Sequence, residues 1–154
     1  MRVLALVDGF HTGELLDSLA RLLSLHEAEL LLVYVQGPGP RAGLDLVRHR
    51  PGGHGLPPHR EHELAAAEHA GSADALAEAE KLASPLAGST KTIQLRGEPG
   101  RAVCEIAARD GVDLVAIMAG DRGQARLGPG SLGPVARFVA DHSPCPVLLL
   151  RAGR

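Results

Sequence analysis

Two short apolar runs, RVLALV at 2–7 and ELLLVYV at 29–35, constrain the fold of this 154-residue chain more than any other feature. Neither run alternates apolar with polar residues, as a strand with one face in water would. Strands that are apolar on both faces are typical of parallel sheets that helices cover on both sides. Each run is also far shorter than the roughly 20 apolar residues of a membrane-spanning helix. The runs therefore predict an α/β protein that does not span a membrane.

The rest of the chain alternates between helix and strand patterns. Leucines at helical spacing follow over 11–26, where Thr12 is a candidate cap. An Ala/Glu-rich segment over about 61–86 favours helix, with a break at Gly71 and Ser72. Three more strand runs are TIQLR at 92–96, VDLVAIMAG at 112–120 and PCPVLLL at 144–150, with helix patterns between them. This order predicts one domain over 1–154, an open, doubly wound, five-stranded parallel sheet in three layers.

Residues 37 to about 70 differ in composition and form an insert. Residues 37–62 are rich in Gly, Pro and His, which predicts a long loop. If the end of the insert is helical, His62 and His69 would share one face of the helix, and a transition-metal site is one reading. A solvated segment with fortuitous histidines is the other reading, and no Cys-x-x-Cys or His-Glu-x-x-His motif supports the metal. The insert holds five histidines, His49, His54, His59, His62 and His69.

Composition excludes several classes of function. One Tyr, two Phe and no Trp leave almost no aromatic surface for stacking single-stranded nucleic acid. Lys plus Arg is 16 and Asp plus Glu is 18, so there is no basic footprint for DNA or RNA. The two cysteines, Cys104 and Cys145, favour a reduced cytoplasmic protein over a disulfide framework. No catalytic triad, carboxylate pair or Gly-Lys-Ser/Thr loop is present, so we expect no enzyme activity beyond weak ATP hydrolysis.

A glycine-containing loop after the fourth strand run is the candidate binding site. Gly120, Gly123 and Gly133 allow close backbone approach, and a helix pattern follows them. The free amides at a helix start favour an anion, and Arg122 and Arg126 would add charge-assisted hydrogen bonds. A plain strand-to-helix turn would use the same glycines, so the pattern alone leaves both readings open.

The predicted topology places other residues at the same edge. Ligands of open α/β sheets bind outside the carboxyl ends of the strands, where the strand order reverses. Asp8, Val35 and Gly120 each lie at such a predicted end. Asp8 also fits the first position of an Asp-Gly turn, which is the purely structural alternative.

Several stretches together resemble the universal stress protein family. Its Gly-x2-Gly-x9-Gly motif matches Gly120, Gly123 and Gly133, and HSPCPV at 142–147 is similar to its His-x-Pro-Cys-Pro-Val signature. VLALVDG at 3–9 and the segment from Gly97 to Gly123 are also similar, so the resemblance covers 1–36 and 88–151. It implies an open five-stranded parallel sheet, a homodimer through the last strand at 147–150, and binding of ATP or AMP, with Mg²⁺ in the case of ATP.

The resemblance also implies roles for individual residues. Asp8 would lie near adenine or ribose, Val35 would touch the base, and the glycine loop would surround ribose and phosphates. The full candidate set is Asp8, Gly9, Val35, Gly120, Asp121, Arg122, Gly123, Arg126, Ser131, Gly133, Pro134 and Val135.

Two residues depart from the family pattern. Pro134 stands where the motif has Ser or Thr, and it lacks both a hydroxyl and a backbone N–H. Ala136 lacks a hydroxyl that nucleotide-binding relatives often have. The leading prediction is a non-enzymatic stress-response module that binds an adenine nucleotide. A dimeric interaction protein that has lost nucleotide binding is the first alternative, and a metal-binding role of the insert is the second.

Overall fold

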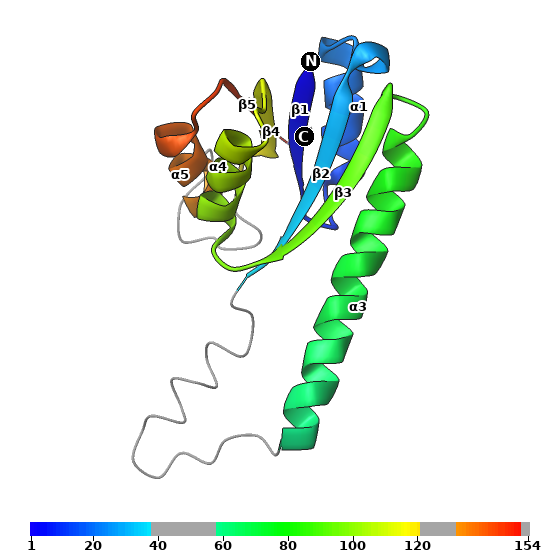
Figure 1. Ribbon diagram of the computed structural model, residues 1–154, viewed down its shortest axis with the longest axis vertical. Helices are drawn as coiled ribbons and strands as arrows, with labels where there is room; N and C mark the ends of the chain where they lie inside the picture. The colour runs from blue at the N-terminus through cyan, green and yellow to red at the C-terminus, as the bar shows by residue number, and fades with distance from the viewer. Residues whose placement is uncertain (38–57, 121–131, 152–154) are drawn as a thin grey trace.

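The computed structural model describes residues 1–37, 58–120 and 132–151, and its centre is one parallel sheet (Figure 1). The strand order is β3-β2-β1-β4-β5, and each neighbouring pair is parallel. The predicted five-stranded parallel α/β sheet is therefore confirmed. Its strands are β1 (Arg2–Val7), β2 (Glu29–Gln36), β3 (Ser89–Arg96), β4 (Leu114–Met118) and β5 (Val147–Leu150).

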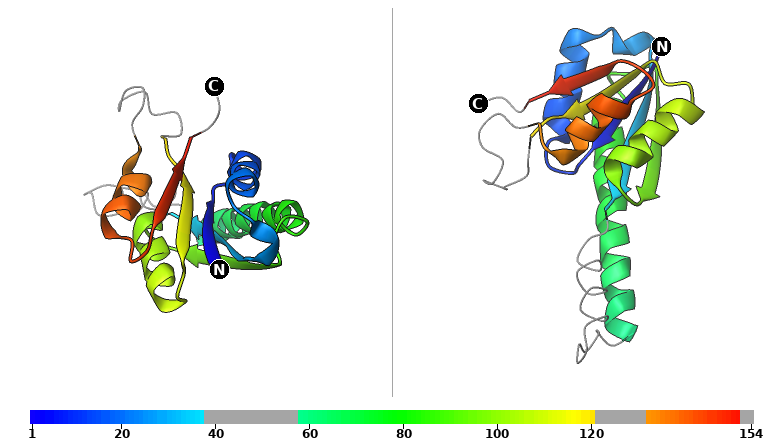
Figure 2. Two further views of the ribbon diagram at one scale, coloured as in Figure 1. Left: turned by 90° about the horizontal axis from the view of Figure 1, so that it is seen from above. Right: turned by 90° about the vertical axis from the view of Figure 1, so that its left-hand side faces the viewer.

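Helices cover both faces of the sheet, which gives the predicted three layers (Figure 2, left). One face carries α1 (Thr12–Leu22) and α3 (Pro58–Ala83), and the short 3-10 helix η1 (Leu25–Glu27) follows α1. The other face carries α4 (Pro99–Arg109) and α5 (Pro134–His142).

The strands bury both faces, as their sequence predicted. Val3, Ala5 and Val7 of β1 pack with the α1 and α3 layer, whereas Leu4 packs with α4 and α5. Because successive strand residues point to opposite faces, one apolar run supplies two cores. Of the five strands, β3 at the sheet edge is the most exposed, and it begins three residues before the predicted run.

A side chain caps the start of α4, whereas no side-chain cap is present at the start of α1. At α4, the Glu98 carboxylate accepts hydrogen bonds from Gly100 N (3.2 Å) and Arg101 N (2.8 Å), and Pro99 opens the helix. At α1, the predicted cap at Thr12 is wrong. His11 is the N-cap, and Thr12 is a buried residue of the first turn.

Helix α3 corrects two sequence-based expectations. It is continuous from Pro58 to Ala83, so the break expected at Gly71 and Ser72 is absent, and the loop expected up to residue 62 ends earlier. The Ser72 hydroxyl donates to the His69 carbonyl (2.9 Å), a bond that leaves the helix intact. The second half packs on the sheet, while the first half extends beyond it (Figures 1 and 2).

None of the helices in the described part of the chain is both long enough and apolar enough to cross a membrane.

Candidate functional site

The strand order creates a crevice between β1 and β4. From β1 the chain moves to β2 and β3 on one side, and then crosses to β4 and β5 on the other. The loops that follow β1 and β4 therefore diverge at the carboxyl edge of the sheet, where open α/β sheets bind ligands. A cavity of about 390 Å³ lies there, bounded by the ends of β1, β2 and β4 and by the starts of α4 and α5. Its size is within the range of small-molecule sites.

Five of the predicted site residues line this cavity: Asp8, Val35, Gly120, Pro134 and Val135. Among the described residues, Gly9 and Gly133 do not line it. Both instead have a positive φ of 77°, which shapes the backbone on either side of the crevice. The other predicted residues, Asp121, Arg122, Gly123, Arg126 and Ser131, lie outside the described residues.

Asp8 is held firmly at the end of β1. Its Oδ1 accepts hydrogen bonds from Phe10 N (2.8 Å) and His11 N (2.7 Å), and its Oδ2 lies 3.0 Å from His11 Nδ1. The side chain is 14% exposed. The carboxylate therefore organises the turn, as the structural alternative predicted, and it also forms part of the cavity wall, where its contact with a ligand stays a prediction.

The start of α5 presents backbone amides beside the cavity. The bonds within the helix begin with Arg137 N donating to Gly133 O (3.1 Å), so Val135 and Ala136 have no acceptor within the helix for their amides. Pro134 occupies the first turn and has no N–H to offer. Helix starts of this kind favour a negatively charged group, here with two amides at the wall.

The two ends of the glycine loop lie close together. Gly120 N donates to Leu132 O at 3.0 Å, and Gly120 has a φ of 142°, a conformation that residues with a Cβ rarely adopt. The end of β4 and the start of α5 are thereby fixed relative to each other at the cavity mouth.

Sequence reasoning missed most of the apolar wall. Tyr34, Ile117 and Met118 lie within strand runs that the sequence assigned to the core, yet they line the cavity. They are among the last three residues of β2 and β4, whereas only the residues at or just after the predicted strand ends were considered from the sequence. The remaining lining residues are Leu6, Val7, Gly37, Pro99 and Ala136. Ala136 was not among the predicted site residues.

Electrostatically, the described wall is nearly neutral. Asp8 is the one charged residue that it contains, and none of its described members is Lys, Arg or His. Such a wall suits a ligand that combines an apolar part with polar groups.

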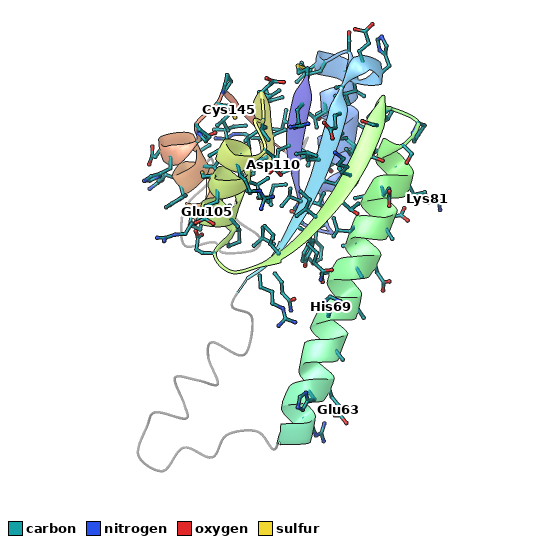
Figure 3. The ribbon with its side chains drawn as sticks, in the orientation of Figure 1. Glu63, His69, Lys81, Glu105, Asp110 and Cys145 are labelled. Atoms are coloured by element: carbon teal, nitrogen blue, oxygen red, sulfur yellow. The ribbon has the colours of Figure 1, made fainter. Side chains whose placement is uncertain are left out.

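No group of three metal-binding side chains converges in the described residues. Both His62 and His69 are exposed on α3. His69, labelled on this helix in Figure 3, has its Nδ1 3.0 Å from Gln94 Nε2. His49, His54 and the side chain of His59 lie outside the described residues, so the metal-binding alternative stays a prediction.

Both cysteines are free and partly buried beside the α4 and α5 core. Burial, and then the neighbouring Cys145, raise the pKa of the Cys104 thiol. A catalytic thiol needs the opposite, because the thiolate is the nucleophile.

Solved structures of other proteins share this fold. The universal stress protein UspA from Lactobacillus plantarum has a TM-score of 0.72 at 22% identity, covering 98% of this chain and 97% of that one. A family protein from Arabidopsis thaliana with AMP bound has a TM-score of 0.66 at 14% identity, covering 99% and 92%. The universal stress protein from Archaeoglobus fulgidus in complex with dAMP has a TM-score of 0.62 at 16% identity, covering 97% and 96%. These likenesses establish the fold alone.

The comparison with curated protein sequences found no match. The model of the universal stress protein family, by contrast, matches residues 1–151. This match spans nearly the whole sequence, including the three strand ends that bound the cavity and the start of α5. The chain therefore belongs to the universal stress protein family.

Proposed function

We propose that this protein binds an adenine nucleotide, ATP or AMP, in the cavity between β1 and β4 and acts as a non-enzymatic sensor or regulator in the stress response. The observation that carries the proposal is the cavity itself, about 390 Å³ in volume at the switch in strand order. Proteins of the same fold have been solved with AMP and with dAMP bound, which supports the adenine nucleotide class.

The wall divides naturally between the parts of a nucleotide. Val35, Ile117 and Met118 offer apolar surface for the base. Asp8 offers carboxylate lone pairs to ribose hydroxyls, and the amides of Val135 and Ala136 face the position of a phosphate. We further propose that Asp121, Arg122, Gly123, Arg126 and Ser131 complete the phosphate side, and that Mg²⁺ accompanies ATP if ATP is the ligand.

A regulatory role fits the chemistry of the described wall better than catalysis does. Asp8 is its one candidate general base, and its Oδ1 already accepts two backbone hydrogen bonds, which leaves Oδ2, beside His11 Nδ1, for a ribose hydroxyl. We also propose a cytoplasmic location, which the two free cysteines support.

Calorimetric titration with AMP and ATP tests the proposal. We expect saturable binding to the wild type and its loss in Val35→Trp, because the larger ring fills the cavity. Leu82→Trp is the matched control, since Leu82 is 39% exposed on α3 and outside the cavity. The proposal would be falsified if millimolar nucleotide gave no heat of binding and no rise in melting temperature with the wild type.

The alternative of an interaction protein without a nucleotide rests on a specific observation. Pro134 removes one amide from the start of α5, and Ala136 brings no hydroxyl to the wall. If this alternative holds, wild-type protein binds no nucleotide and Pro134→Ser gains binding. Wild-type binding that Pro134→Ser leaves unchanged would exclude it.

A further inference from the structure

We propose that His11 is a positioning residue for nucleotide binding, because its imidazole Nδ1–H donates to Asp8 Oδ2 and fixes the carboxylate of the cavity wall. The inference rests on the proposed function, since it concerns how a neighbouring residue prepares that same site. It depends on contacts within residues 8–11 and not on the loop that follows β4. The described residues that line the cavity include Asp8 but not His11, so His11 acts through Asp8.

The chemistry of the pair assigns the proton that lies between the two side chains. His11 Nδ1 is 3.0 Å from Asp8 Oδ2. An ionised carboxylate has no proton to give, so the imidazole nitrogen must be the donor. The neutral Nδ1–H tautomer and the imidazolium both meet this requirement. The neutral Nε2–H tautomer does not, because its Nδ1 would turn a lone pair toward the carboxylate.

The backbone of the turn holds the other carboxylate oxygen. Asp8 Oδ1 accepts hydrogen bonds from Phe10 N (2.8 Å) and from His11 N (2.7 Å). These two bonds fix Oδ1 and the bond from the imidazole fixes Oδ2, so the carboxylate cannot rotate without losing one of them. A carboxylate oxygen has lone pairs for more than one hydrogen bond, so Oδ2 can accept from His11 and from a ligand hydroxyl together.

Packing and helix contacts keep the rest of the turn in place without the imidazole. Gly9 has a φ of 77°, and a Cβ added there would lie 3.5 Å from Ala75 Cβ of α3. At the start of α1, Leu15 N donates to the backbone carbonyl of His11, and the His11 side chain makes no capping bond. Replacing this side chain should therefore preserve the fold and remove the bond to Oδ2, so a ligand would have to order the carboxylate as it binds.

The test is calorimetric titration of the full chain with adenosine and with AMP. We expect His11→Ala to weaken both ligands by about 5- to 10-fold, as for the loss of one charge-assisted hydrogen bond that orients a ligand contact. His11→Asn should bind within about 2-fold of the wild type, because its amide nitrogen, also bonded to Cγ, can donate to the same carboxylate. In an Asp8→Asn background, His11→Ala should change the affinity by less than about 2-fold.

His26→Ala is the matched control, because His26 is an exposed histidine of η1 that lies with Arg2 at the amino edge of the sheet, away from the cavity. It should leave both dissociation constants unchanged. A second measurement needs no variant, since proton–nitrogen correlation spectra of the wild type should show a proton on His11 Nδ1.

Three results would overturn this inference and leave the proposed function standing. The first is unchanged affinity in His11→Ala, or an equal loss in His11→Asn. The second is the same loss from His11→Ala in the Asp8→Asn background. The third is a neutral His11 ring protonated on Nε2, which decides the matter even if a variant folds poorly. Failure of both ligands to bind the wild type overturns the inference and the proposed function together.

Discussion

Gly100 is the residue on which the contact between α4 and α5 depends most directly. A Cβ added there would lie 2.8 Å from Phe138 Cδ1, closer than real Cβ contacts, and 3.0 Å from Phe138 Cβ and Cγ, tighter than most of them. The aromatic ring of α5 therefore packs directly on the backbone of α4, beside the first turns that border the cavity. Gly100 acts here through its small size.

We expect Gly100→Ala to lower the free energy of unfolding by about 1 kcal/mol. Overpacking costs about 1–3 kcal/mol, and the gain in helix propensity offsets up to about 1 kcal/mol of it. Urea denaturation followed by circular dichroism measures the change. An unchanged or higher stability would mean that Phe138 moves aside freely.

Gly71→Ala is the matched control for that substitution. Gly71 is exposed within α3, and nothing lies within 4 Å of the position of its Cβ. Alanine should therefore raise the free energy of unfolding by about 0.5–1 kcal/mol, because it restricts the unfolded chain and favours helix. The two alanine variants should thus shift the urea midpoint in opposite directions.

At the candidate site, the sequence identified residues at loop positions better than residues inside strands. Asp8 and Gly120 follow apolar runs, and the rule for open α/β sheets directs attention to them. Tyr34 and Met118 line the same cavity, but in a sequence they look like any other apolar strand residue. What distinguishes them is that they line the cavity at the carboxyl edge of the sheet, which depends on how the layers pack and not on local composition.

At the scale of the element, α3 shows tertiary contacts overriding a local signal. Gly and Ser disfavour helix interiors, so the sequence predicted a break at Gly71 and Ser72. In the fold, Ser72 is buried and its hydroxyl bonds to the His69 carbonyl, while Leu76 and Ala79 pack on the sheet. The packing of the next two turns on the sheet keeps the chain helical at Gly71 and Ser72.

The α3 contact with the sheet predicts an asymmetry between two leucines. Leu76 is 6% exposed in the core, whereas Leu82 is 39% exposed. We expect Leu76→Ala to cost about 2–4 kcal/mol of unfolding free energy and Leu82→Ala less than about 1 kcal/mol. Equal losses in urea denaturation would show that the second half of α3 is not anchored through Leu76.

An ion-pair network links the amino ends of three strands. Glu29 of β2 accepts from Lys91 Nζ of β3 (2.6 Å) and from Arg2 Nε of β1 (2.7 Å). The hydrogen bond from Lys91, followed by that from Arg2, lowers the pKa of Glu29 below its ordinary value of 4.5. The network lies at the end of the sheet away from the cavity, so its effect is on stability and not on the site.

This lowered pKa has a defined consequence for acid stability. A carboxylate with a lowered folded pKa stabilises the fold above its ordinary pKa, and loses that contribution as the pH falls through the folded value. We expect the melting temperature of Glu29→Gln to fall less than that of the wild type between pH 7 and pH 3. Glu78→Gln, at an exposed position of α3, should follow the wild-type curve. If the melting temperatures of Glu29→Gln and wild type fell in parallel with pH, the stabilising effect of the ionised Glu29 would be contradicted.

At the scale of the whole molecule, the alternation of apolar runs and helix patterns was enough to predict the sheet and its two covering layers. Right-handed crossovers then restrict the topologies available to such a chain. The amino end of β3 was missed because Ser89 to Lys91 are polar residues of an edge strand, where exposure weakens the apolar signal. The extension of α3 beyond the sheet was also not predictable. Helix propensity indicates which residues are helical, but it does not indicate which part of the helix packs on the sheet.

The other sheet edge raises the question of assembly. Strand β5 pairs with β4 on one side and is the last strand of the sheet among the described residues. Val115 N donates to Pro146 O (3.0 Å) and Ala119 N donates to Leu150 O (2.6 Å), so the carbonyls of Pro146, just before β5, and of Leu150 point toward β4. Because backbone groups alternate along a strand, the N–H and C=O of Leu149 point to the open edge. An edge of this kind is a template for pairing with a second chain.

We predict a homodimer through β5 in which the outward N–H of Leu149 takes part. Leu149→Pro removes that N–H without removing a bond to β4, so it should convert the dimer to a monomer. Leu149→Ala is the control, because it loses the same side-chain contacts with the α4 and α5 core but keeps the N–H. Light scattering coupled to size-exclusion chromatography gives the mass of each. A dimeric proline variant would place the interface elsewhere, and a monomeric wild type would remove the homodimer altogether.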